Sequence, residues 1–444
     1  MRSKDLPARG KTEMARTNGR RTFTRREVNT GLGTATVAAA LGAPALANAK
    51  AKVVVIGGGA GGATAAKYIA RGTTDKIAVT LVEPEPTYMT CFHSNLVLGG
   101  FKTLADISYT YDKLIANYGL SLVPQRASRI DRSARRVFLA DGTALDYDAL
   151  VLSPGIDLKY DSVPGWGKEH EETMPHGWKA GPQTLLLKTM LDRVPDGGLI
   201  VVLAPPNPYR CPPAPYERVS MMAHTLQRAG KANCKIIILD PKDKFSKQAL
   251  FQEGWEKHYP GMIEWLSRDV YEDIQSVDPA SNTVVTGFET YKNAALVNVI
   301  PAQMAGAIAR HSELHNETGF CPIHPSSMQS AIDPNIFIIG DACVAGEMPK
   351  SAFAANSQAK VAAAAVRTRF STTRTPSPRL QNICWSMIAA DDAVKVGARY
   401  EAKAGRISSV ENFVSQTGED VVLRRKTQFE NLGWYEGMTA DIFL

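Results

Sequence analysis

The chain lacks any apolar run of the roughly 18 to 20 residues that a membrane-spanning helix needs. It also lacks a marked excess of one charge outside its first segment. The 444 residues include 51 lysines and arginines and 44 acidic residues, but residues 1–49 hold nine of the basic and three of the acidic side chains. The other 42 basic and 41 acidic residues nearly cancel, so the charge does not indicate binding to nucleic acid or to an anionic membrane. We expect a soluble or peripheral protein with no membrane span.

Metal-binding and haem-binding patterns are missing as well. None of the six cysteines belongs to a C-x-x-C or C-x-x-C-H motif, which excludes a zinc ribbon and a c-type haem attachment site within this chain. His311 and His315 are four residues apart in a segment with a helical pattern, but no glutamate motif or third ligand accompanies them. We therefore predict no metal site.

The N-terminal segment has the features of an export signal. Arg20 and Arg21 begin a stretch, RRTFTR, that resembles the twin-arginine signal, and Arg25-Arg26 offers an overlapping register. A weakly apolar stretch follows, and small residues provide a cleavage site near Ala47 or Ala49. We predict that residues 1–49 are removed and that the protein is periplasmic, where disulfides can form. A disordered basic tail followed by an alanine-rich helix is the alternative.

A dinucleotide-binding motif follows this segment. Residues 52–56 form a β-branched run that leads directly into Gly57, Gly59 and Gly62 in the pattern G-x-G-x-x-G. These glycines allow a tight turn, a close approach of the backbone to a pyrophosphate, and close packing of the next helix, whose N-terminus faces the anion. A second strand ends at Glu83, where a carboxylate can bind a ribose hydroxyl. This order of elements predicts a Rossmann-like lobe.

A later segment favours FAD over NAD as the dinucleotide. Residues 335–342 form another buried strand that ends in Gly340-Asp341, which resembles the FAD-binding segment of two-dinucleotide flavoproteins. The resemblance implies that Asp341 accepts hydrogen bonds from the ribityl chain. Taken alone, Gly340-Asp341 could also be an ordinary turn at a strand end.

The second lobe has a strand without a phosphate-binding loop. Residues 199–204 match the strand that begins a nicotinamide domain, but residues 205–213 read PPNPYRCPP. Proline has no amide hydrogen, so this loop cannot offer a run of N–H groups to a pyrophosphate. We expect a second Rossmann-like lobe without a functional NAD site.

Five segments carry a further resemblance, and three of them contain a cysteine: residues 88–100, 174–181, 210–218, 319–322 and 348–358. Together they resemble the flavoprotein subunit of flavocytochrome c sulfide dehydrogenase, and the match runs from about Lys52 to the C-terminus. One departure is the His93-Ser94-Asn95-Leu96 stretch, where relatives often have an aliphatic residue and an acid; this affects the expected substrate range.

The resemblance implies roles for three cysteines. Cys91 matches the cysteine that forms a thioether to the flavin, so that FAD would be covalently bound. Cys211 and Cys321 match a redox-active disulfide, which sulfide, a soft anion, can attack. Without the resemblance, Cys91 would be read as a small buried side chain and the other two as a structural disulfide. We expect Cys234, Cys343 and Cys384 to be structural.

Two charged residues are candidates for tuning the chemistry. Glu217, six residues after Cys211 and near a helix start, could take the proton of hydrogen sulfide, although a solvated glutamate or a salt bridge to Arg218 fits equally. Lys350 resembles a position near the flavin pyrimidine, or is a surface lysine. The aromatic residues Trp178, Phe353 and Tyr216 either line the site or fill the core.

Together these patterns predict an α/β protein with two Rossmann-like lobes and a small α+β C-terminal interface domain. The expected function is periplasmic oxidation of sulfide to sulfane sulfur or polysulfide, with electrons passed to a c-type cytochrome partner. A sulfide:quinone oxidoreductase, or a flavin-dependent accessory protein that reactivates a sulfur-carrier complex, is the alternative. The expected segments are a signal at 1–49, an FAD domain at 50–160 and 299–373, a second lobe at 161–298 and the interface domain at 374–444.

Overall fold

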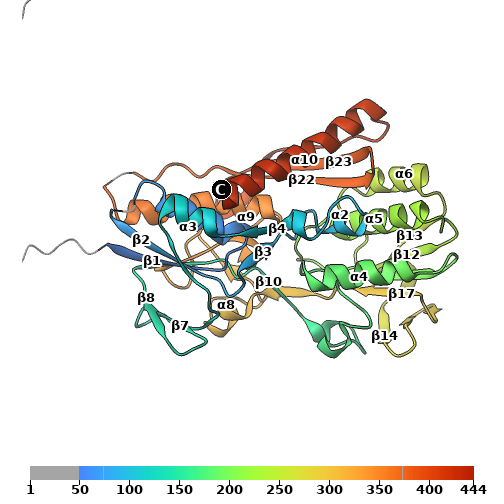
Figure 1. Cartoon of the computed structure of the whole chain (residues 1–444), viewed down its shortest axis with the longest axis horizontal. Coiled ribbons are helices and arrows are strands. Elements are labelled where there is room, and N and C mark those ends of the chain that lie inside the picture. Colours follow the sequence, from blue (N-terminus) through green and yellow to red (C-terminus); the bar gives the residue numbers. More distant parts are fainter. Residues whose placement is uncertain (1–49, 74, 373) are drawn as a thin grey trace, which may run out of the picture. The chain divides into compact units, whose positions relative to one another are not determined.

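The computed structural model describes residues 50–73, 75–372 and 374–444 (Figure 1). The predicted export signal lies outside the described residues. Within them, helices and strands alternate around two parallel sheets. This confirms the predicted α/β class with two Rossmann-like lobes.

The first lobe is built on a parallel sheet with strand order β20-β9-β1-β2-β5. Its central strand β1 is buried from Val53 to Ile56, as expected for a strand covered on both faces. Helices α1 and α9 pack together beside it, so that segments far apart in the chain complete one lobe. The elements are β1 (Ala51–Ile56), α1 (Ala60–Ala70), β2 (Ile77–Val82), β5 (Ser121–Val123), β9 (Ala149–Leu152), β20 (Ile336–Ile338) and α9 (Ala352–Arg369).

The turn between β1 and α1 requires glycine at two places. Gly57 has a φ of +97°, and a Cβ at Gly62 would lie 1.8 Å from the carbonyl oxygen of Gly57. A side chain at Gly62 would therefore push the helix away from the strand. The predicted roles of these two glycines as turn and packing residues fit this geometry.

The second lobe has a parallel sheet with strand order β13-β12-β11-β17. Residues 205–213, which contain the prolines, connect its first strand to helix α5, as the sequence pattern indicated. The elements are α4 (Pro182–Arg193), β11 (Leu199–Leu203), α5 (Ala214–Arg228), β12 (Lys235–Asp240), α6 (Gln248–His258), β13 (Ile263–Ser267) and β17 (Leu296–Val299).

The C-terminal region is an antiparallel sheet followed by a long helix. Strand β22 contacts α5 of the second lobe and α9 of the first. Helix α10 reaches the first lobe, where Lys67 Nζ donates a hydrogen bond to the carbonyl oxygen of Asp441 (2.9 Å). The elements, drawn in orange and red in Figure 1, are β22 (Leu380–Ala389), β23 (Asp392–Lys403), β24 (Arg406–Val414) and α10 (Val421–Phe443).

Short strands and helices connect these units. The strands form small sheets β3-β4, β6-β7-β8, β10-β18, β14-β15-β16 and β19-β21. In the described part of the chain, no helix is long and apolar enough to span a bilayer. The short elements are β3 (Thr87–Met89), α2 (Ser94–Leu98), β4 (Ser108–Thr110), α3 (Asp112–Tyr118), β6 (Ala127–Asp131), β7 (Arg136–Leu139), β8 (Ala144–Asp146), β10 (Ile156–Leu158), α7 (Arg268–Tyr271), β14 (Ile274–Asp278), β15 (Thr283–Thr286), β16 (Thr290–Tyr291), β18 (Gln303–Ala305), α8 (Ala307–His311), β19 (Cys321–Pro322) and β21 (Cys343–Val344).

Candidate active site

Two cavities meet at the carboxyl ends of the first parallel sheet. One is an open groove of about 610 Å³ that begins at the glycine turn. The other is a smaller cavity of about 60 Å³, lined by residues from both lobes and from the C-terminal region, which we call the inner cavity. Four residues line both of them, so the inner cavity lies at one end of the groove: Cys91, Arg210, Ser351 and Ala352.

The groove has the features of a dinucleotide site. Gly57, Gly59, Glu83 and Asp341 all line it. The Glu83 carboxylate accepts a hydrogen bond from the Gly58 backbone N–H (2.7 Å), which holds it beside the glycine turn. The structure thus brings the predicted glycines and carboxylates together, and the N-terminus of α1 faces the same space.

One carboxylate oxygen of Asp341 accepts no hydrogen bond from the described part of the protein. This oxygen, Oδ1, is buried. Burial raises the pKa of this carboxyl, while the nearby Arg210 and Lys350 oppose the shift. A buried acceptor that lines the groove calls for a donor from a bound molecule, and a ribityl hydroxyl would supply one. The groove therefore fits FAD.

Cys91 stands where the groove and the inner cavity join. Its carbonyl oxygen accepts a hydrogen bond from the Ser94 hydroxyl (2.7 Å) at the start of helix α2. The sulfur is thus held on a short ordered segment at the end of the dinucleotide groove.

Cys211 lines the inner cavity from the loop that replaces the phosphate-binding loop. Its φ is +58°, and its backbone N–H donates a hydrogen bond to the carbonyl oxygen of Lys350 (2.7 Å). Burial raises the pKa of the thiol well above its ordinary value, and the other cysteines near enough to act on it are Cys384 and Cys91.

Cys321, the predicted partner of Cys211, is not among the residues that line the inner cavity. It lies in β19, paired in register with Cys343 of β21. All six cysteines are free thiols in the structure. Strand β19 is held against β21 by backbone hydrogen bonds, which keeps Cys321 beside Cys343 rather than beside Cys211.

Cys384, which we predicted to be structural, lines the inner cavity instead. It lies on β22, and this strand packs on α5 directly after the Cys211 loop. Asn382, two residues earlier on the strand, contacts its sulfur through a hydrogen bond of 3.4 Å. No spacing or motif in the sequence indicated this contact, because it depends on how the C-terminal sheet packs on the second lobe.

Glu217 also lines the inner cavity, from the first turn of α5. One carboxylate oxygen accepts from the Asn95 side-chain amide (2.9 Å) and the other from the Met387 backbone N–H (3.0 Å). Burial raises its pKa, while these two hydrogen bonds oppose the shift. A carboxyl with a raised pKa beside two thiols can exchange protons with them.

Lys350, predicted to lie near a flavin pyrimidine or at the surface, is not among the residues that line the groove. Its ammonium donates to the carbonyl oxygens of Asp341 and Cys343 (both 2.8 Å) and lies 3.8 Å from the centre of the Phe320 ring. The side chain therefore fixes the backbone that carries Asp341. Burial lowers its pKa.

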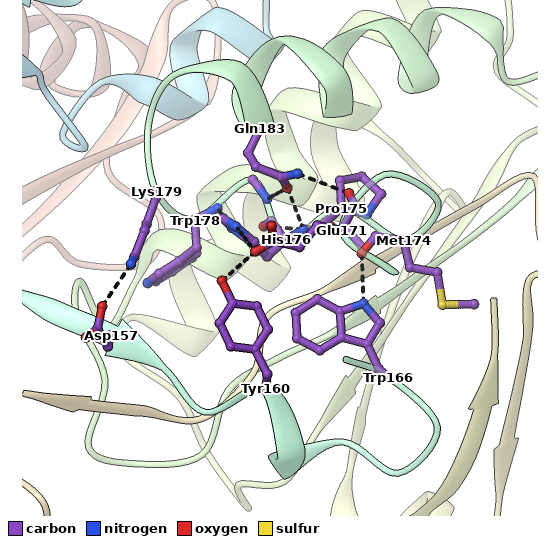
Figure 2. A network of polar contacts seen from close by, with 12 residues as sticks. Asp157, Tyr160, Trp166, Glu171, Met174, Pro175, His176, Trp178, Lys179 and Gln183 are labelled. Carbon is purple, nitrogen blue, oxygen red and sulfur yellow. Dashed lines mark hydrogen bonds and ion pairs between the residues drawn. The ribbon is translucent and has the colours of Figure 1, made fainter. Parts of the chain in front are cut away.

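A buried polar network holds Trp178 in the wall of the inner cavity (Figure 2). The Trp178 backbone N–H donates to Nδ1 of His176 (2.7 Å), and Nε2 of His176 lies 3.2 Å from Glu171. Since Nδ1 accepts, Nε2 carries the hydrogen and donates to the carboxylate. Burial and the nearby Arg218 lower the pKa of His176 to about 3, so the ring is neutral.

Arg218 supports the same wall. Its guanidinium is almost fully buried and donates to the carbonyl oxygens of His176 (2.7 Å) and Gly177 (2.6 Å). It also donates to the side-chain oxygens of Asn95 (3.2 Å) and Asn298 (3.0 Å). The predicted alternative of a salt bridge with Glu217 does not occur. Burial lowers the pKa of Arg218 to about 9.

Aromatic side chains close the other side of the inner cavity. Trp434 of α10 stacks on Phe353 with ring centres 6.3 Å apart and on Trp385 at 5.2 Å. The predicted aromatic wall is thus formed by Trp178 and Phe353, whereas Tyr216 is buried in the second lobe and hydrogen-bonded to Asp240. In the described chain, no group of three or more His, Cys, Asp or Glu side chains could hold a metal ion.

Comparisons with protein families match three parts of the chain. Residues 184–301 match the central domain of the flavoprotein chain of sulfide dehydrogenase (flavocytochrome c), and residues 376–443 match the flavin-binding domain of flavocytochrome c sulphide dehydrogenase. Residues 51–178 match the pyridine nucleotide-disulphide oxidoreductase family.

Curated relatives include sulfide-oxidising enzymes. The mitochondrial sulfide:quinone oxidoreductase of Dictyostelium discoideum is 22% identical over 326 residues, 70% of this chain and 69% of its own length. The sulfide-quinone reductase of Aquifex aeolicus is 28% identical over 179 residues, 40% of each chain.

Solved structures share the fold at low identity. The sulfide:quinone oxidoreductase from Aquifex aeolicus has a TM-score of 0.71 and 18% identity, with 88% of this chain and 91% of that chain covered. An NAD-dependent persulfide reductase from A. fulgidus has a TM-score of 0.59 and 16% identity, with 88% and 78% covered.

Proposed function

Because the chain belongs to the flavoprotein family of flavocytochrome c sulfide dehydrogenase, we propose that it oxidises hydrogen sulfide to sulfane sulfur and passes the electrons to a c-type cytochrome. The observation that carries this proposal is the inner cavity itself. It places Cys211 and Cys384 together, and it joins the dinucleotide groove at Cys91. The site thus combines a pair of thiols with a place for FAD.

FAD is held in this proposal by the glycine turn, Glu83 and Asp341, and linked covalently through Cys91. A bound flavin supplies a two-electron acceptor that can release its electrons one at a time, which a haem partner requires. The unpaired Oδ1 of Asp341 and the position of Cys91 at the end of the groove support this assignment.

The cysteine pair carries the sulfur chemistry. In the oxidised protein, Cys211 and Cys384 form a disulfide, and a hydrosulfide anion attacks one of its sulfurs. The new S–S bond makes a persulfide on that cysteine, and the bond that breaks leaves its electron pair on the other cysteine as a thiolate. A second hydrosulfide then displaces the sulfane sulfur, which leaves both cysteines reduced and an inorganic disulfide as product.

Glu217 is the general base in this scheme. Its raised pKa lets the carboxylate accept a proton from hydrogen sulfide as the anion forms. The hydrogen bonds from Asn95 and Met387 hold both of its oxygens in place. His176 is neutral and fully used in the wall, so it does not compete for this role.

The size of the inner cavity supports a small inorganic substrate. A cavity needs roughly 10 to 15 Å³ to hold one water-sized group, whereas pockets for drug-sized ligands are about 300 to 1,000 Å³. The inner cavity has about 60 Å³. This is enough for hydrosulfide and a short sulfur chain, but not for a peptide thiol such as glutathione.

A quinone is the second candidate for the electron acceptor, because the curated relatives named above are quinone-linked. A cavity of about 730 Å³ next to the inner cavity, which shares Phe353 and Trp434 with it, offers room for a flat apolar ring. The other alternative, an accessory protein that reactivates a sulfur-carrier complex, would use the same thiols without oxidising sulfide.

Export and partnership complete the proposal. We place the protein in the periplasm on the strength of Arg20-Arg21 and the small residues near Ala47 and Ala49. The C-terminal region is the proposed contact with the cytochrome subunit. The boundaries of the proposed domains stay predictions.

One assay separates these functions. The purified flavoprotein is given sulfide together with cytochrome c, a candidate haem subunit or a soluble quinone, and acceptor reduction is followed. We expect reduction of cytochrome c, most strongly with the haem subunit. Reduction of quinone alone would support the second candidate, and no sulfide-dependent reduction of any acceptor would refute sulfide oxidation.

A further inference from the structure

Lys247 is a buried lysine that lies against the strand of Cys384. It precedes helix α6 with a φ of +63° and is 9% exposed. Its ammonium donates to the Ser386 hydroxyl (2.8 Å) and to the carbonyl oxygen of Cys384 (3.3 Å), both on β22. Both acceptors are uncharged. Burying an ammonium without a bonded carboxylate costs folding free energy unless other nearby groups stabilise its charge.

The titratable groups that face this ammonium belong to the inner cavity. Burial lowers the pKa of Lys247 to about 8, while three groups favour its charged form: Cys384 on β22, Glu217 on α5 and Cys211 on the loop before α5. The remaining neighbour from its own helix is the Phe251 ring, 5.7 Å away. Glu217 is already bound by Asn95 and Met387, so it is not hydrogen-bonded to Lys247.

The two cysteines differ in their electrostatic surroundings. Burial raises the pKa of Cys384 and Glu217 adds to this shift, but the hydrogen bonds of Asn382 and Ser351 and the charge of Lys247 oppose it. Burial raises the pKa of Cys211 well above its ordinary value. The neighbours Cys384, Glu217 and Cys91 add to this shift, and Arg210 opposes it. An anion is therefore better stabilised on Cys384 than on Cys211.

We infer that Lys247 is a positioning residue of the reaction: its ammonium stabilises the thiolate of Cys384, so that Cys384 leaves and Cys211 takes the persulfide. This inference rests on the proposed function of the cysteine pair. In the step, hydrosulfide forms a bond to Cys211 Sγ, the bond between the two cysteine sulfurs breaks, and its electron pair stays on Cys384 Sγ. The more stable thiolate is the better leaving group.

The test measures the thiols directly in the flavin-loaded protein. After reduction, the alkylation rate of each cysteine by iodoacetamide is followed by mass spectrometry as a function of pH. For Lys247→Met we expect the thiolate pKa of Cys384 to rise and its alkylation near neutral pH to slow about tenfold, which corresponds to one pKa unit. Lys247→Arg keeps the charge and should restore the profile.

A redox measurement gives an independent readout. A cation that stabilises the thiolate stabilises the reduced pair, so its loss should make the pair harder to reduce. A tenfold change in the equilibrium constant against a thiol buffer corresponds to a midpoint about 30 mV more negative. Lys242→Met is the matched control, because that buried lysine pairs with Asp240 in the second lobe.

The outcomes separate the inference from the function on which it rests. An unchanged Cys384 profile in folded Lys247→Met protein would overturn the role of Lys247. Failure of Cys211 and Cys384 to form a disulfide would instead refute the proposed function, whatever the thiolate data show. If Lys247→Met does not fold, Ser386→Ala removes the acceptor that holds the ammonium, and a shift of the same sign is expected, about threefold in rate.

Discussion

Cys211 and Cys384 line the same small cavity, although one belongs to the loop that follows β11 and the other to the antiparallel sheet near the C-terminus. Burial raises the pKa of both thiols, and the neighbouring Cys384 adds to the shift at Cys211. The first predictions depend on this relationship, because the proposed reaction needs a disulfide between these two sulfurs.

Replacing either cysteine of the pair should stop the reaction. Cys211→Ser or Cys384→Ser removes one sulfur of the proposed disulfide, so sulfide-dependent bleaching of the flavin should fall by at least about 10³-fold, as expected when a covalent nucleophile is lost. Stopped-flow absorbance measures the bleaching.

Cys321→Ser is the matched control for these variants, because Cys321 is buried beside Cys343 and does not line the inner cavity. Its activity should stay within a few-fold of the parent protein. Loss of activity in Cys321→Ser, with Cys384→Ser unaffected, would restore the original assignment of the disulfide.

The flavin should be covalently attached through Cys91. After acid precipitation and washing, the yellow chromophore should stay with the polypeptide, and peptide mapping should find it on the segment that contains Cys91. Cys91→Ala should release it into the supernatant, because the noncovalent contacts of the groove remain but the thioether is absent. Free flavin from the parent protein would contradict the link.

Glu217 should set the acidic side of the pH profile. Burial raises its pKa, so the carboxyl stays protonated to a higher pH than usual and loses its function as a base when the pH falls through that value. The rate of flavin reduction by sulfide should therefore drop toward acidic pH in the parent protein. Glu217→Gln should lower the rate about 10²-fold and remove this dependence.

A surface carboxylate is the control for Glu217. Glu256→Gln, on the exposed side of α6, should leave both the rate and its pH dependence unchanged. If Glu217→Gln keeps the acidic limb, the limb belongs to the ionisation of sulfide or of a thiol rather than to Glu217.

The inner cavity should exclude organic thiols as sulfur acceptors. With sulfide as substrate, added glutathione should not change the rate, and the first product should be inorganic disulfide or short polysulfide, since about 60 Å³ cannot hold a peptide thiol. Alkylation of the products followed by mass spectrometry measures this.

Enlarging the wall tests the same explanation. Phe353→Ala removes a ring from the cavity lining and should allow small thiols such as 2-mercaptoethanol to accept the sulfane sulfur. Phe288→Ala, at a side chain that is 71% exposed in the second lobe, is the control. Glutathione persulfide as the first product of the parent protein would show that the sulfur is reached by another route.

The sequence by itself determined the local features of this protein. The β-branched run before Gly57, the spacing to Gly62 and the strand that ends at Asp341 specify the first lobe, because backbone sterics and burial act over a few residues. The prolines after β11 exclude a phosphate-binding loop in the same local way. The family resemblance indicated Cys211, and Glu217 was predicted from its place near the start of the next helix.

Only the tertiary structure decided which cysteine lines the inner cavity with Cys211 and which groups the lysines bind. Cys321 is drawn to Cys343 by the pairing of β19 with β21, and Lys350 turns to the carbonyl oxygens of Asp341 and Cys343. Cys384 lines the inner cavity because β22 packs on α5, and Lys247 donates a hydrogen bond to the same strand. Such contacts join residues far apart in the chain through side-chain packing, so a local sequence pattern does not predict them.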